Sequence, residues 1–277
     1  YERDANNSWQ SLKLLPPADS EFAKRGNGFG HAVDIDDSGA IVIGAQIREA
    51  RGVTPRREPG DGMLRFSGVY TADVTNDLVM KVANLDSLQE EYIYGHSVTR
   101  SGEHIGVGLR VVRGDDYGFS RVLLVNLDDG TQEVITTPAE STGYFGTALA
   151  SHGTRLVAGL PGSTSTRGMI IDLETGQQSK ISTIGSSSAY TGFAVDIVDG
   201  NVVIGVSGGI VIAREEQGTW VVEDLIPIDN DVVAISRKYA SILPRESARI
   251  IPAGDTSHAI PPLDLTLIDI KTGDSVT

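Results

Sequence analysis

The sequence contains no cysteine, and it is also short of basic residues and long apolar runs. Without thiols, neither a disulfide framework nor a thiolate metal site can form. No run of about 18 apolar residues occurs, so a membrane-spanning helix is not expected. Lys and Arg number 23 against 37 Asp and Glu, which gives a net charge of −14. This charge argues against nucleic acid as a partner, because phosphate binding needs a basic face.

The chain begins with Tyr1 rather than Met. Removal of a secretory signal would produce such a start, and a cloning boundary would do so equally well. Together with the resemblance described below, this leads us to expect an extracellular, periplasmic or cell-surface location.

Helical patterns are missing as well. No segment of ten or more residues shows a convincing 3.6-residue apolar period, so we expect very little helix. Glycine is abundant instead, at 32 of 277 residues, and favours turns. The composition therefore predicts a chain made mainly of strands and turns.

One glycine-centred segment occurs four times, at residues 28–45, 93–109, 144–161 and 190–207. Each copy has a signature glycine, a small residue, a polar turn that contains glycine, and a β-branched run that ends in glycine. The signature glycines are Gly30, Gly95, Gly146 and Gly192, about 65, 51 and 46 residues apart. A degenerate fifth copy, which lacks this glycine, is predicted at residues 230–243.

A second unit follows each copy, starting at Gly68, Ser120, Arg167, Gly208 and Leu263. Each such unit has two β-branched runs around a short polar turn, which is typical of a β-hairpin. One repeat is therefore four strands, and repeats of this kind indicate a β-propeller, in which closure of the ring removes long exposed sheet edges.

We predict a single β-propeller domain of five blades over residues 1–277. The predicted repeats span residues 26–85, 92–137, 143–184, 189–228 and 229–277, and the strand at 9–16 is expected to complete the last blade. A fragment of a larger ring would show the same local pattern, so the blade number stays open at this stage.

These motifs resemble FG-GAP repeats, which form the propeller of integrin α-subunits and of many secreted bacterial proteins. The resemblance rests on Phe29-Gly30, Phe145-Gly146 and the variant Tyr94-Gly95, and on the strand endings IVIGA, LVAGLP and VVIGV. It extends from about residue 26 to 213. It implies a propeller fold, cell-surface location, and partner binding in adhesion or carbohydrate recognition.

Blades of this family often carry calcium loops between their first two strands, so the resemblance raises calcium as a cofactor. Only Asp34, Asp36 and Asp37 approach such a loop here, and Val42 replaces the distal aspartate. Calcium needs six to eight oxygen ligands, and the other three loops do not supply carboxylates in this pattern. We therefore expect a hairpin turn and no cofactor, with weak calcium binding at these three aspartates as the alternative.

Long connections between the second and third strands, and between blades, are expected on one face, which we call the long-loop rim. They lie at residues 46–67, 109–120, 160–168 and 244–262, and loops of such length are often functional. Arginine forms bidentate contacts with carboxylate, sulfate or phosphate, and tyrosine can stack on a sugar or anchor a protein. The candidate ligand-binding residues on this rim are Arg48, Arg51, Arg56, Arg57, Arg65, Arg110, Arg113, Tyr117 and Tyr92.

Two other sequence features indicate a function less strongly than the long-loop rim does. His31 and His96 occupy the same repeat position, where Thr147 and Phe193 follow, so no third repeat supplies a histidine for a metal site. Arg113-Gly114-Asp115 spells a tripeptide that many integrins recognise, although such a tripeptide also arises by chance.

The leading functional hypothesis is a non-catalytic propeller that binds a protein or glycan through the long-loop rim, as one subunit of a surface assembly. A carbohydrate-active enzyme of glycosidase or lyase type, with carboxylates in the channel, is the first alternative. Asp34 and Asp196 share a repeat position, but no set of nucleophile, base and orienting group is evident. A purely structural lattice or filament component is the second alternative.

Overall fold

The structure is a computed structural model. It describes residues 2–3, 9–10, 14–25, 28–36, 38–49, 64–73, 78–82, 92–111, 120–136, 145–161, 166–182, 191–198, 200–206, 209–227, 231–235, 239–243, 266–269 and 275–276. The chain divides into two compact units, Tyr1–Ile135 and Thr136–Thr277. Each unit is described by itself, and the single-domain interpretation stays a prediction.

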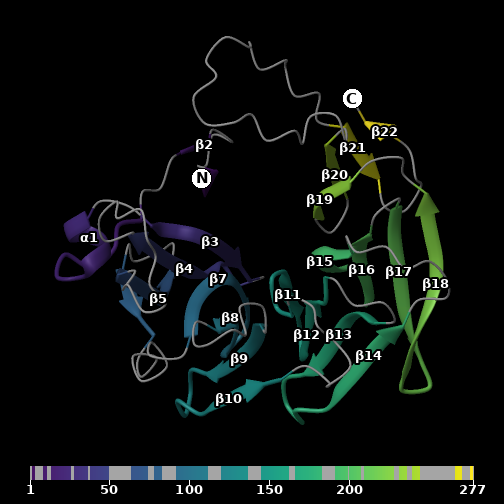
Figure 1. Cartoon of the computed structure of the whole chain (residues 1–277), viewed down its shortest axis with the longest axis horizontal. Coiled ribbons are helices and arrows are strands. Elements are labelled where there is room, and N and C mark those ends of the chain that lie inside the picture. The colour runs from purple at the N-terminus through teal and green to yellow at the C-terminus, as the bar shows by residue number, and fades with distance from the viewer. Residues whose placement is uncertain are drawn as a thin grey trace, which may run out of the picture. The chain divides into compact units, whose positions relative to one another are not determined.

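The described residues form five four-stranded antiparallel sheets, drawn in Figure 1. Each sheet lies inside one predicted repeat, so the expectation of an all-β chain of four-stranded units is confirmed. Unit 1 contains β3 (Phe29–Ile35), β4 (Ala40–Glu49), β5 (Leu64–Asp73) and β6 (Leu78–Lys81), then β7 (Tyr92–Ser101), β8 (His104–Val111), β9 (Ser120–Asn126) and β10 (Gln132–Ile135).

Unit 2 contains the other three sheets. They are β11 (Leu149–His152), β12 (Arg155–Gly159), β13 (Thr166–Asp172) and β14 (Gln178–Ser182), then β15 (Thr191–Val198), β16 (Asn201–Val206), β17 (Gly209–Glu216) and β18 (Thr219–Pro227), and finally β19 (Asp231–Ile235), β20 (Tyr239–Leu243), β21 (Thr266–Asp269) and β22 (Ser275–Val276).

Consecutive sheets within a unit pack against each other through their first two strands. In unit 1, β3 and β4 contact β7, and in unit 2, β11 and β12 contact β15 while β15 and β16 contact β19. Valine, isoleucine and leucine side chains fill these interfaces, as in the cluster that joins Val42 and Val69 to Val107 and Leu123. Face-to-face packing of four-stranded antiparallel sheets is the arrangement of propeller blades.

Three of the signature glycines, Gly30, Gly95 and Gly192, lie at irregularities of the first strands, and Gly146 lies in the turn before β11. In β3 the pairing shifts between Phe29 and Ala32, and in β7 it shifts between Tyr94 and Val98. All four glycines have a positive φ between 76° and 79°. Glycine adopts this left-handed conformation at little cost, which explains why a β-bulge at this point carries it.

The glycines of the second strands, Gly44 and Gly159, are required for a different reason, which is close packing between sheets. Gly44 of β4 lies against the backbone of Gly95 in the next sheet, and Gly159 of β12 lies against the backbone of Gly192 in the next sheet. A Cβ atom at Gly44 or Gly159 would overlap the carbonyl oxygen of that neighbouring glycine. The two halves of the repeated motif thus contact each other across consecutive sheets.

The outer hairpins use the predicted turn residues. Glu216 pairs with Thr219 across the two residues Gln217 and Gly218, which have φ values of 51° and 78°. Two consecutive positive φ angles define a type I′ turn, whose twist matches that of the flanking strands.

Aspartate side chains support two further outer turns. A backbone hydrogen bond and a side-chain hydrogen bond from Thr131 hold the pKa of Asp129 below its usual value. The hydroxyl and then the backbone amide of Thr175 lower the pKa of Asp172 in the same way, because both stabilise the carboxylate.

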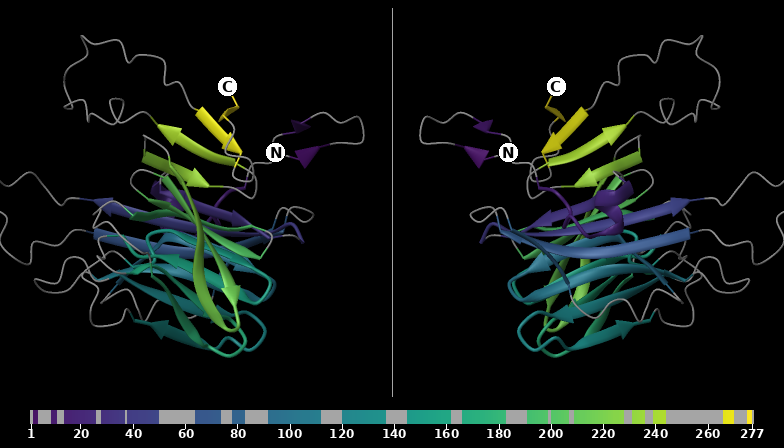
Figure 2. Two further views of the ribbon diagram at one scale, coloured as in Figure 1. Left: turned by 90° about the vertical axis from the view of Figure 1, so that its right-hand side faces the viewer. Right: turned by 90° about the vertical axis from the view of Figure 1, so that its left-hand side faces the viewer.

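One face of the first sheet is partly covered by the only helix among the described residues. Helix α1 (Glu21–Arg25) directs Phe22 onto Tyr70, with ring centroids 6.0 Å apart and planes at 88°. The helix lies beside this sheet in Figure 2 as well. Val33 and Ile35, on the first strand of the same sheet, stay 59% and 55% exposed.

The last sheet takes all four of its strands from the C-terminal repeat. Its outermost strand is β22, in which Val276 pairs with Leu267, and not the segment 9–16 that the sequence predicted for this place. Trp9–Gln10 forms β2 and pairs with β1 (Glu2–Arg3) in a two-stranded sheet. A hairpin to the adjoining segment closes a much shorter loop than pairing with the other end of the chain, so it costs less entropy.

Candidate functional site

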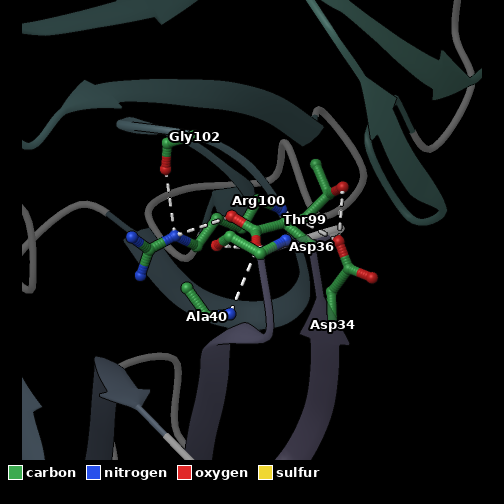
Figure 3. A network of polar contacts seen from close by, with 7 residues as sticks. Asp34, Asp36, Ala40, Thr99, Arg100 and Gly102 are labelled. Atoms are coloured by element: carbon green, nitrogen blue, oxygen red, sulfur yellow. Dashed lines mark hydrogen bonds and ion pairs between the residues drawn. The ribbon is translucent and has the colours of Figure 1, made fainter.

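A partly buried polar network joins the two sheets of unit 1 (Figure 3). The carboxylate of Asp34, on β3, accepts a 2.8 Å hydrogen bond from the hydroxyl of Thr99 and a 2.9 Å hydrogen bond from the backbone amide of Arg100, both on β7. Thr99 is fully buried. A buried hydroxyl needs a partner, so Asp34 acts as an acceptor that links consecutive sheets.

Asp36 organises the turn that follows β3. One carboxylate oxygen accepts hydrogen bonds from the amide and hydroxyl of Ser38 and from the amide of Ala40. The other oxygen lies 3.4 Å from Nε of Arg100, and that nitrogen also donates to the carbonyl of Gly102 at 3.0 Å. This is an Asx turn with an ion pair to the neighbouring sheet.

These contacts bear on the calcium interpretation of Asp34, Asp36 and Asp37. The carboxylates of Asp34 and Asp36 each accept hydrogen bonds from protein groups, and Asp34 is directed at the neighbouring sheet. Asp37 lies outside the described residues. Within the described part of the chain, no three His, Asp or Glu side chains gather as metal ligands would. Turn formation accounts for the hydrogen bonds of Asp36, and sheet linkage accounts for those of Asp34. Weak calcium binding at these aspartates stays a prediction.

Sequence reasoning missed Thr99 and Arg100 as partners of Asp34. A signal existed, because Thr99 occupies in the second repeat the position that Asp34 occupies in the first. A carboxylate and a hydroxyl at equivalent positions of consecutive blades can meet if the blades stack in register.

In unit 1, equivalent positions of the two sheets lie beside each other. Gly44, which pairs with Ala32, packs on Gly95, and two residues further along β3 Asp34 bonds to Thr99. Strands β3 and β7 therefore run in the same direction. It follows that β4 and β8, each antiparallel to its first strand, end at the same edge of unit 1.

Four of the nine candidate ligand-binding residues fall at this edge. Arg48 and Arg65 are register partners near the end of β4 and the start of β5. Arg110 lies near the end of β8, where it pairs with Ile93, and Tyr92 begins β7. The strands continue through Glu49 and Leu64, so the predicted loop at 46–67 is shorter than expected, because its ends join the β4–β5 ladder.

The other five candidates, Arg51, Arg56, Arg57, Arg113 and Tyr117, lie outside the described residues, as does the Arg113-Gly114-Asp115 tripeptide. The long-loop rim is thus represented in the described structure by the strand ends that carry Arg48, Arg65, Arg110 and Tyr92.

A histidine pair lies on the first strands of the same two sheets. Nε2 of His31 is 3.3 Å from Nδ1 of His96, and the ring centroids are 5.3 Å apart with planes at 39°. Both rings are exposed. Each follows a signature glycine directly, so the two bulges bring equivalent repeat positions together.

Comparisons with known proteins add little to this geometry. The sequence matches no protein-family model and no curated protein sequence. Among solved structures, a luciferin-regenerating enzyme is similar over 82% of this chain and 72% of its own, with 11% identity and a TM-score of 0.45. The β-propeller domain of the Trilobed protease from Pyrococcus furiosus is similar over 88% of this chain and 69% of its own, with 10% identity and a TM-score of 0.47.

The described helical content is limited to α1, and no helix of the described residues has the length and apolar character needed to cross a bilayer.

Proposed function

We propose that the chain is a non-catalytic, extracellular or cell-surface β-propeller that binds a protein or glycan partner through the long-loop rim, as a subunit of a surface assembly. The observation that carries this proposal is the common edge of unit 1, where Arg48, Arg65, Arg110 and Tyr92 are brought to the ends of stacked sheets.

The charge of this edge favours an acidic partner. Arg48 and Arg65 occupy directly opposed positions of an antiparallel pair, where like charges destabilise a sheet. Guanidinium donates paired hydrogen bonds to carboxylate, sulfate or phosphate, so the partner class that fits is a sulfated or carboxylated glycan or an acidic protein surface.

The rim is tested by binding to an array of sulfated, sialylated and neutral glycans. Replacing Arg56→Ala together with Arg57→Ala is expected to weaken binding of acidic glycans about tenfold or more, because charge-assisted hydrogen bonds are lost. The matched control, Lys180→Ala with Arg214→Ala, removes the same charge from outer strands of unit 2 and should leave binding unchanged. Binding that survives Arg56→Ala with Arg57→Ala, and also survives Arg48→Ala with Arg65→Ala, rejects the arginine rim.

We further propose that the five sheets are the blades of one closed ring. The repeat of one sheet type along the whole chain supports this, as does the apolar character of Val33 and Ile35 on the first strand of the first sheet, since a closed ring covers both faces of every blade.

Ring closure is tested by placing charge on that strand. In a closed ring, Val33→Asp with Ile35→Asp buries two carboxylates and should lower the melting temperature by about 10 °C or more. Met80→Asp, at an outer-strand position that is 56% exposed, is the control and should shift it by no more than about 2 °C. Equal melting temperatures for the two variants would mean that the ring is open.

A further inference from the structure

We propose that His31 and His96 form a binding site for one divalent transition-metal ion that prefers imidazole, namely Zn²⁺ or Cu²⁺. The sequence argues against a metal at this position, because only two repeats supply histidine. The structure adds two observations, which are the short distance between one nitrogen of each ring and the exposure of both rings.

The distance between the facing nitrogens suits one shared ion. Zinc binds histidine nitrogen at about 2.0–2.1 Å, and in a tetrahedral site two such nitrogens lie about 3.3–3.4 Å apart. Nε2 of His31 and Nδ1 of His96 are separated by 3.3 Å. The two nitrogens therefore already lie at the separation that one shared tetrahedral ion needs.

The backbone holds both histidines in equivalent settings. Gly30 and Gly95, with φ values of 77° and 79°, precede them in the bulges of β3 and β7. Three residues beyond the histidine of each strand, Asp34 accepts a hydrogen bond from Thr99, which fixes the two strands against each other. Two ligands on firmly packed strands lose little entropy when they bind an ion.

The remaining coordination positions lie toward solvent, because both rings are exposed. Water or a ligand atom from a partner would complete the four-coordinate shell, as in metal sites that keep open positions. The net charge of −14 favours cation binding over the whole chain. With two protein ligands, we expect micromolar affinity and a preference for Cu²⁺ over Zn²⁺, following the general stability order of divalent ions.

Isothermal titration with ZnCl₂ and CuCl₂ at pH 7.5 tests the site on the full chain. The wild type is expected to bind one ion per chain, and His31→Ala and His96→Ala should each weaken this binding about tenfold or more. His104→Ala with His152→Ala removes two histidines that belong to different sheets and should leave the binding unchanged.

Electron paramagnetic resonance of the Cu²⁺ complex supplies the second readout, since coupling to two ring nitrogens is expected in the wild type and not in His31→Ala. Thermal melts without metal should match across all variants, because His31, His96 and His152 are exposed and His104 is only partly buried. The proposal is overturned if the wild type binds neither ion, or if the double variant His31→Ala with His96→Ala binds as the wild type does.

Discussion

Gly159→Ala is expected to destabilise the chain by about 3 kcal/mol or more. The new methyl group would overlap the carbonyl oxygen of Gly192 and lie 3.0 Å from its carbonyl carbon. Both partners are backbone, so no side-chain rotation can relieve the overlap. Hydrogen bonds from the amide of Gly159 to Ala148, at 2.9 Å, and from the amide of Gly146 to the carbonyl of Gly159, at 3.1 Å, also hold the strand in place.

Urea denaturation followed by circular dichroism measures this loss. Gly153→Ala is the matched control, because Gly153 has a φ of 58° and no other atom lies within 4 Å of a Cβ added there. That variant should lose only about 1 kcal/mol of stability, because alanine is strained in the left-handed conformation. If Gly159→Ala loses no more stability than Gly153→Ala, the close approach between consecutive sheets does not exist in solution.

Asp34→Ala is expected to cost about 2–4 kcal/mol. It removes the acceptor of the fully buried Thr99 hydroxyl and of the Arg100 amide, and each orphaned donor costs about 1–3 kcal/mol. Asp128→Ala, at an exposed turn of unit 1, is the control for losing one carboxylate and should stay within about 0.5 kcal/mol of the wild type.

A double-mutant cycle separates the network from simple charge loss. Thr99→Val keeps the shape of the side chain and removes its donor, so Asp34→Ala in that background should cost less than it does in the wild type. Additive effects of the two substitutions in urea denaturation would show that the carboxylate and the hydroxyl do not act together.

The strands and turns of each sheet could be predicted from the sequence because their causes are local. Runs such as Val202–Val206 are β-branched, and turns such as Gln217-Gly218 need residues that tolerate a positive φ. The role of Asp34 could not be predicted in the same way. Its partners are on another sheet, 65 and 66 residues away, and only the stacking of sheets brings them together.

The edge of the last sheet shows a second limit of sequence reasoning. Two segments, 9–16 and the end of the chain, both have the composition of an outer strand, and composition does not decide which of them pairs. The described pairing of Leu267 with Val276 assigns the outer strand to the nearer segment.

The long-loop rim could not be predicted from the repeat, because the repeated motif does not include the residues of the rim. The register of β4 with β5 places Arg48 opposite Arg65, which follows from counting residues along two strands once their pairing is known. The connections beyond these strands differ in length and sequence from repeat to repeat, so periodicity cannot describe them.

The glycine contacts join two pairs of consecutive sheets in the same way. Each contact takes one glycine from the second strand of one sheet and one from the first strand of the next, namely Gly44 and Gly95 or Gly159 and Gly192. A side chain introduced at Gly44 or Gly159 would clash with the backbone of the neighbouring sheet. No rearrangement within its own repeat could relieve that clash.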